Sequence, residues 1–99
     1  MNNQLKTNIK KIITNQLGNK VKIFLFGSRA DNTHTKQSDY DIGIISNTPI
    51  PFDTMQRIKE NIDKLPILQQ IDIIDFKRVN ADFYNKVLSS ENSVIKELV

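Results

Sequence analysis

Hydrophobic positions along this 99-residue chain follow two spacings, one typical of helices and the other typical of strands. Apolar residues that recur every three or four positions predict amphipathic helices over residues 5–17, 53–65 and 80–88. Short, nearly continuous runs of β-branched and aromatic residues predict strands over residues 21–26, 40–45 and 70–76. The apolar run of the first strand indicates burial on both of its faces. The tail, residues 91–99, fits either a short strand or a helix.

Capping and breaking residues mark the ends of these elements. Gly18 follows the first helix, where a left-handed C-terminal cap would place a glycine. Ser28 is a candidate N-cap for a short helix after the first strand, and Asp53 and Asn80 are candidate N-caps for the later helices. Pro66 is expected to stop the middle helix.

The alternation of helices and strands predicts one α/β (α+β) domain over residues 1–99, with helices packed on a small mixed sheet. A shared site would require the end of the first strand to meet the start of the second, which makes these two strands antiparallel. The helix between the second and third strands allows a parallel crossover. The expected strand order is therefore 1-2-3.

Composition narrows the possible partners and location. The net charge is +3, and lysines are mixed with acids rather than gathered in a stripe, which argues against direct nucleic-acid binding. No apolar run is long enough to span a bilayer, and no membrane association is expected. The chain has no cysteine and no signal-like N-terminus, which agrees with a cytoplasmic location.

The candidate chemistry lies on three carboxylates. Asp39 and Asp41 are two positions apart at the start of a strand, so their side chains point to the same side. Two carboxylates on one side suit Mg²⁺, and a two-metal phosphoryl-transfer site needs a further acid. Asp72 and Asp75 are the candidates, and they face opposite sides of the third strand. Asp72 is preferred because it lies nearer the start of its strand.

A phosphate-binding element precedes these acids. Gly27 lets the backbone approach a phosphate closely, and Ser28 at a helix N-terminus offers a hydroxyl and exposed N–H groups. Arg29 adds a possible charge-assisted contact to a phosphate. His34, the only histidine, stands in a polar stretch with no second ligand nearby, so a solvated loop residue is the preferred interpretation.

These residues together resemble a known motif. Residues 26–30 (Phe-Gly-Ser-Arg-Ala) and 38–42 (Ser-Asp-Tyr-Asp-Ile) look like the Gly-Ser-x10-Asp-x-Asp motif of the DNA polymerase beta nucleotidyltransferase superfamily. The length and residues 71–75 (Ile-Asp-Ile-Ile-Asp) resemble its minimal nucleotidyltransferase (MNT) branch. One departure is Asp31-Asn32, where many members have Arg-Gly.

The resemblance implies a nucleotidyltransferase fold with two Mg²⁺ ions held by Asp39, Asp41 and Asp72, and with Gly27 and Ser28 contacting the triphosphate of ATP. Members of this branch resemble antitoxins that pair with a helical HEPN ribonuclease toxin. The implied function is transfer of AMP from ATP to a tyrosine hydroxyl of that toxin, within a hetero-oligomer. Two alternatives are transfer to a small molecule such as an aminoglycoside, and a non-catalytic antitoxin that acts by steric occlusion.

Overall fold

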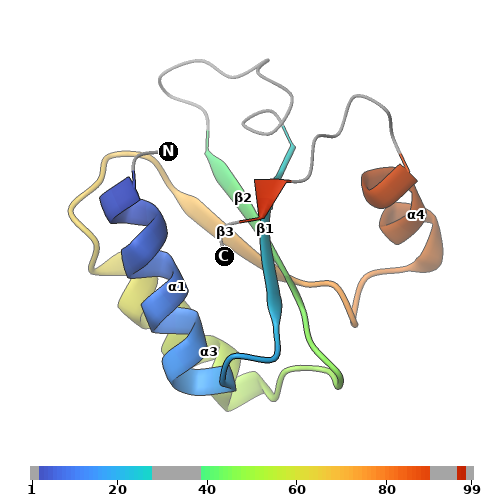
Figure 1. Ribbon diagram of the computed structural model, residues 1–99, viewed down its shortest axis with the longest axis horizontal. Coiled ribbons are helices and arrows are strands. Elements are labelled where there is room, and N and C mark those ends of the chain that lie inside the picture. The colour runs from blue at the N-terminus through green and yellow to red at the C-terminus, as the bar shows by residue number, and fades with distance from the viewer. Residues whose placement is uncertain (1–2, 28–38, 90–95, 98–99) are drawn as a thin grey trace.

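A mixed sheet organises the part of the chain that the computed structural model describes, residues 3–27, 39–89 and 96–97 (Figure 1). Its strands are β1 (Lys22–Phe26), β2 (Tyr40–Ile45), β3 (Ile71–Asp75) and β4 (Lys96–Glu97), in the order β3-β2-β1-β4. β1 is antiparallel to β2 and β4, and β2 is parallel to β3. The predicted order 1-2-3 and strand directions are confirmed, and the tail contributes a two-residue strand.

Helices α1 (Asn3–Leu17) and α3 (Phe52–Asp63) lie on one side of the sheet, and α4 (Ala81–Ser89) lies on the other (Figure 1). Between the sheet and the first two helices is an aliphatic core, whose fully buried members include Ile9, Ile13, Ile42, Ile44 and Ile58. Burying such side chains supplies the main driving force for folding. None of the described helices combines the length and apolar character that a bilayer crossing requires.

The opposite face of the sheet carries an aromatic cluster. Phe24 and Phe26 from β1 pack against Phe76 and Val87, and all four side chains are buried. The Phe24 and Phe76 rings meet edge to face with centroids 4.8 Å apart, a favoured aromatic arrangement. The predicted burial of β1 on both faces is therefore confirmed. Gly43 of β2 makes room for this cluster, because a Cβ there would lie 2.7 Å from Cε1 of Phe76.

Two of the predicted caps are confirmed and one is wrong. Gly18 has a φ of +81° and donates its N–H to the Thr14 carbonyl at 2.8 Å, which ends α1. The Asn80 side chain accepts the Phe83 N–H at 2.8 Å at the start of α4. Asp53 does not cap α3, because the Pro51 carbonyl already accepts the first helical hydrogen bond. Asp53 lies instead in the first turn, near the positive end of the helix dipole.

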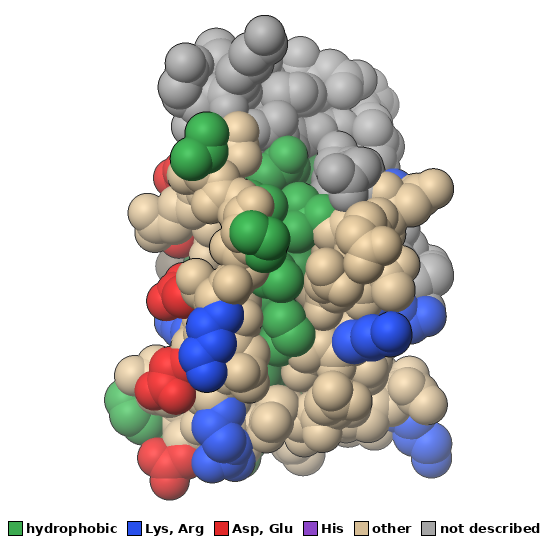
Figure 2. All heavy atoms as spheres, turned by 90° about the vertical axis from the view of Figure 1, so that its left-hand side faces the viewer, with side chains coloured by type: hydrophobic (Ala, Val, Ile, Leu, Met, Phe, Trp, Pro, Cys, Tyr) green, Lys and Arg blue, Asp and Glu red, His purple; other side chains and the backbone are tan. Residues whose placement is uncertain are grey.

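α3 ends at Asp63, ahead of the predicted stop at Pro66, because the chain tightens there into a turn. The Leu65 N–H bonds to the Ile62 carbonyl three residues back. Figure 2 shows the face that carries α1 and α3, where an apolar band runs between charged side chains. Hydrophobic residues that are half-buried against this side of the core are Ile12, Leu17, Val21, Met55, Leu65 and Ile67.

Candidate active site

The strand register places Asp41 at the centre of the candidate site. Its Cα pairs with that of Phe26 on β1 and with that of Asp72 on β3. Paired residues on neighbouring strands project to the same face, so Asp41 and Asp72 share the face that carries the aromatic cluster. Asp39 directly precedes β2 and is exposed. The fold therefore brings together the end of β1 and the starts of β2 and β3.

Gly27 directly follows β1 and has a φ of +74°, a left-handed conformation that favours glycine. A Cβ built at this position would collide with Oδ2 of Asp41. The backbone of Gly27 thus lies directly against the central carboxylate, and any larger residue would displace it. Ser28 and Arg29, the other predicted phosphate-binding residues, lie outside the described residues, as do His34 and the short helix predicted from Ser28.

Negative charge is concentrated around Asp41. Partial burial raises the pKa of the Asp41 carboxyl above its ordinary value, and the neighbouring charges of Asp72 and then Asp39 raise it further. Each of these causes disfavours the ionised form. A cation bound between the carboxylates would reverse the effect, because it would supply the missing opposite charge.

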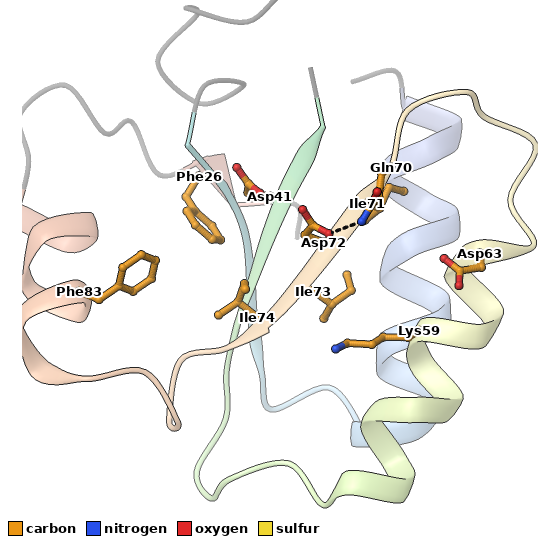
Figure 3. Close-up of a pocket in the computed structure, with 10 residues that line it drawn as sticks. All are labelled: Phe26, Asp41, Lys59, Asp63, Gln70, Ile71, Asp72, Ile73, Ile74 and Phe83. Carbon is orange, nitrogen blue, oxygen red and sulfur yellow. Dashed lines mark hydrogen bonds between the residues drawn. The ribbon is translucent and has the colours of Figure 1, made fainter. Parts of the chain in front are cut away.

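Asp72 is oriented by Gln70, which directly precedes β3. The Gln70 side-chain amide donates a hydrogen bond to Oδ1 of Asp72 at 2.9 Å (Figure 3). Within residues 3–27, 39–89 and 96–97, no three acidic, histidine or cysteine side chains converge into a preformed metal-binding group. The oxygen-only donor set of Asp39, Asp41 and Asp72 nevertheless suits Mg²⁺ chemically. Gathering these three carboxylates around an ion requires their side chains to turn.

Asp75 occupies the opposite face of β3 and is fixed by structural contacts. Its side chain is buried, at 6% exposure. Its carboxylate accepts the Ile50 N–H at 2.7 Å and the Lys77 N–H at 2.9 Å, and it lies 3.5 Å from Nε of Arg78. These bonds tie the segment before α3 to the end of β3. Asp75 is therefore directed away from Asp41, whereas Asp72 lies beside it.

A cavity of about 800 Å³ is lined by Asp41 and Asp72 and extends around the edge of β3 with which no described strand pairs. Figure 3 shows Phe26 and Phe83 on one side, Lys59 and Asp63 of α3 on the other, and Asp41 and Asp72 between them. The sequence predicts Phe83 only as part of the apolar stripe of the helix over residues 80–88, and it does not single out Lys59, Asp63 or Gln70. These residues come from separate elements, and no local pattern connects them to the acids.

Comparisons with known proteins agree with this geometry. Residues 7–97 match the family model described as "Polymerase beta, Nucleotidyltransferase". The chain is 32% identical over 89 residues to a Haemophilus influenzae protein named "Probable protein adenylyltransferase MntA", covering 90% of this chain and 77% of that protein.

Solved structures share the fold at lower identity. A toxin–antitoxin crystal structure with AMP-PNP matches with a TM-score of 0.66 at 20% identity, over 95% of this chain and 72% of that one. A tri-AMPylated Shewanella oneidensis HEPN toxin in complex with MNT antitoxin matches with a TM-score of 0.64 at 18% identity, over 100% of this chain and 72% of that one.

Proposed function

Because this chain belongs to the polymerase beta nucleotidyltransferase family, we propose that it is a Mg²⁺-dependent protein adenylyltransferase and an antitoxin. Its substrate would be ATP, and its acceptor a tyrosine hydroxyl on a HEPN toxin with which it forms a complex. The observation that carries the proposal is the pairing of Asp41 with Asp72 beside Gly27. The 32% identical adenylyltransferase and the AMPylated HEPN–MNT complex of the same fold support the choice of acceptor.

In this proposal, Asp39, Asp41 and Asp72 hold the metal ions. Bound Mg²⁺ would neutralise the triphosphate and stabilise charge on the leaving pyrophosphate. Because Gly27 has no side chain, its backbone would be able to approach the nucleotide phosphates beside Asp41. Ser28 is proposed to donate to these phosphates and Arg29 to pair with them.

Asp72 is proposed to accept the proton of the acceptor hydroxyl, in the orientation that its hydrogen bond from Gln70 sets. The acceptor oxygen then forms a bond to the α-phosphorus, and the bond from that phosphorus to the pyrophosphate oxygen breaks. Most of the rate enhancement would come from positioning and from preorganised charge. A protein acceptor would approach these groups from the cavity, which extends around the edge of β3 with which no described strand pairs.

The test is transfer of label from α-labelled ATP to a purified HEPN toxin that forms a complex with this chain, with Mg²⁺ present. We expect a labelled toxin whose ribonuclease activity is lost. Asp41→Asn should reduce transfer by roughly a hundredfold or more, the range typical of losing a group that acts directly on the reacting atoms. Asp53→Asn is the matched control, since Asp53 is an exposed acid on α3 outside the cavity.

An unlabelled toxin after incubation with the wild-type chain would contradict the proposal. Full silencing of the toxin by Asp41→Asn, without label transfer, would instead support neutralisation by steric occlusion.

A further inference from the structure

Phe83 of α4 is a partly exposed aromatic side chain on the wall of the candidate active site. It is 37% exposed and lines the same cavity as Asp41 and Asp72. Single exposed apolar residues are common on protein surfaces and need no special explanation. Phe83 is not isolated, however, because Phe26 and Ile74 continue the apolar wall on its side of the cavity (Figure 3).

The position of Phe83 is set by several contacts. Its backbone N–H is the one that Asn80 caps. Its ring lies edge to face against Phe26, with centroids 6.2 Å apart, and tilted against Phe76, with centroids 5.8 Å apart. Helix capping and two aromatic contacts therefore hold the ring at the cavity wall.

Phe26 connects this wall to the carboxylates, because its Cα is the direct cross-strand partner of Asp41. Phe83 contacts Phe26, and Phe26 is the cross-strand neighbour of Asp41. The cavity has carboxylates at one position and an apolar aromatic wall at another. A nucleoside triphosphate has the same division, with phosphates at one end, a flat base at the other and a ribose between them.

We propose that Phe83 provides the surface on which the nucleobase of the bound nucleotide stacks. This inference rests on the proposed function, because it assumes that the triphosphate lies at Asp41 and Asp72. Aromatic side chains stack on every base, since each base has a π-face. The tyrosine ring of the acceptor has similar chemistry, and the experiment below separates these two sources of a planar ring.

Binding of ATP and of inorganic tripolyphosphate to the full chain, both with Mg²⁺, tests the proposal. Tripolyphosphate retains the charged end of the ligand and lacks the base. We expect Phe83→Leu to weaken ATP binding by roughly ten- to a hundredfold, as the loss of one base–aromatic stack does. Tripolyphosphate binding should be unchanged, and Phe83→Trp should retain ATP affinity. Phe52→Leu is the matched control, because Phe52 is 73% exposed on α3 and lies outside this cavity.

Three results would overturn the assignment of the base to Phe83. These are unchanged ATP affinity in Phe83→Leu, an equal loss for ATP and tripolyphosphate, and a rise in KM for the protein acceptor alone. The second would mean that the variant distorts the cavity, and the third that the ring contacts the acceptor. A wild-type chain that binds neither ligand would overturn the proposed function as well, so the two failures are distinguishable.

Discussion

Asparagine substitutions at two aspartates of β3 should separate stability from catalysis. Asp75 is buried and bonded on one face of the strand, and Asp72 lies beside Asp41 on the other. We expect Asp75→Asn to destabilise the fold and leave the chemistry intact. We expect Asp72→Asn to leave the fold intact and abolish most of the transfer.

The magnitude for Asp75 follows from its contacts. The two carboxylate oxygens accept the N–H groups of Ile50 and Lys77, and asparagine can serve only one of them. A hydrogen bond to a charged group contributes about 1.5–3 kcal/mol, and the amide NH₂ would then face a second donor. The ion pair with Arg78, whose side chain is 59% exposed, contributes little. The expected loss is therefore about 2–4 kcal/mol, or about 10–25 °C in the unfolding temperature of a domain this size.

Asp72→Asn should cost little stability. The Asp72 side chain accepts a hydrogen bond from the Gln70 amide, and asparagine keeps an oxygen that can accept this bond. Removing its charge also relieves repulsion with Asp41. We therefore expect an unfolding temperature equal to or above that of the wild type. Transfer should fall by about a hundredfold or more, the range for a lost general base.

Both variants should be compared by thermal unfolding followed by circular dichroism, and by label transfer measured well below the unfolding temperature of Asp75→Asn. A wild-type unfolding temperature for Asp75→Asn would refute the structural role given to its carboxylate. Retained transfer in Asp72→Asn, together with lost transfer in folded Asp75→Asn, would reverse the choice of the third acid.

Three further predictions concern the neighbours of Asp41. Gly27→Ala should abolish transfer, and in urea unfolding it should destabilise the fold more than Gly18→Ala does. Both glycines have a positive φ, but only at Gly27 would the new Cβ meet a carboxylate. The raised pKa of the Asp41 carboxyl favours folding while that group is protonated, so the contribution of Asp41 to the free energy of unfolding should decrease as the pH rises from 3.8. Asp41→Asn should remove that slope, and Mg²⁺ should reduce it in the wild type. Gln70→Ala should lower kcat by a few-fold with little change in unfolding temperature, because it frees Asp72 from its orienting bond without removing the acid.

Much of the fold was predictable because its signals are local. The strand over residues 40–45 was predicted with the bounds that β2 has, since a buried run between polar flanks marks both ends. The residue type of Asp53 alone predicts a cap, yet the N-cap position of α3 is occupied by Pro51, two residues earlier. The two-residue β4 has no local signal of its own, because its definition rests on pairing with β1.

Some residues of the candidate site could likewise be placed from the sequence, and others could not. The placement of Asp72 beside Asp41 could be predicted once a shared site was assumed, because the helix before the third strand allows a parallel crossover and Asp72 lies near the start of that strand. The position of Phe83 on the cavity wall could not be predicted, because a helical apolar stripe has the same spacing whether it fills a core or lines a cavity. Lys59 and Gln70 reach the cavity from elements that only tertiary packing brings together.

The pairing of β4 with β1 also bears on how the chain folds as it is synthesised. β1 is the most continuously apolar strand, and its outer edge at Phe24 and Leu25 is paired by residues 96 and 97. Chains emerge from the ribosome N-terminus first, so this edge stays open until those residues have been made. An unpaired apolar edge is a template for association with other chains. The pairing of β4 with β1 therefore covers part of this edge, and it can form only late in synthesis.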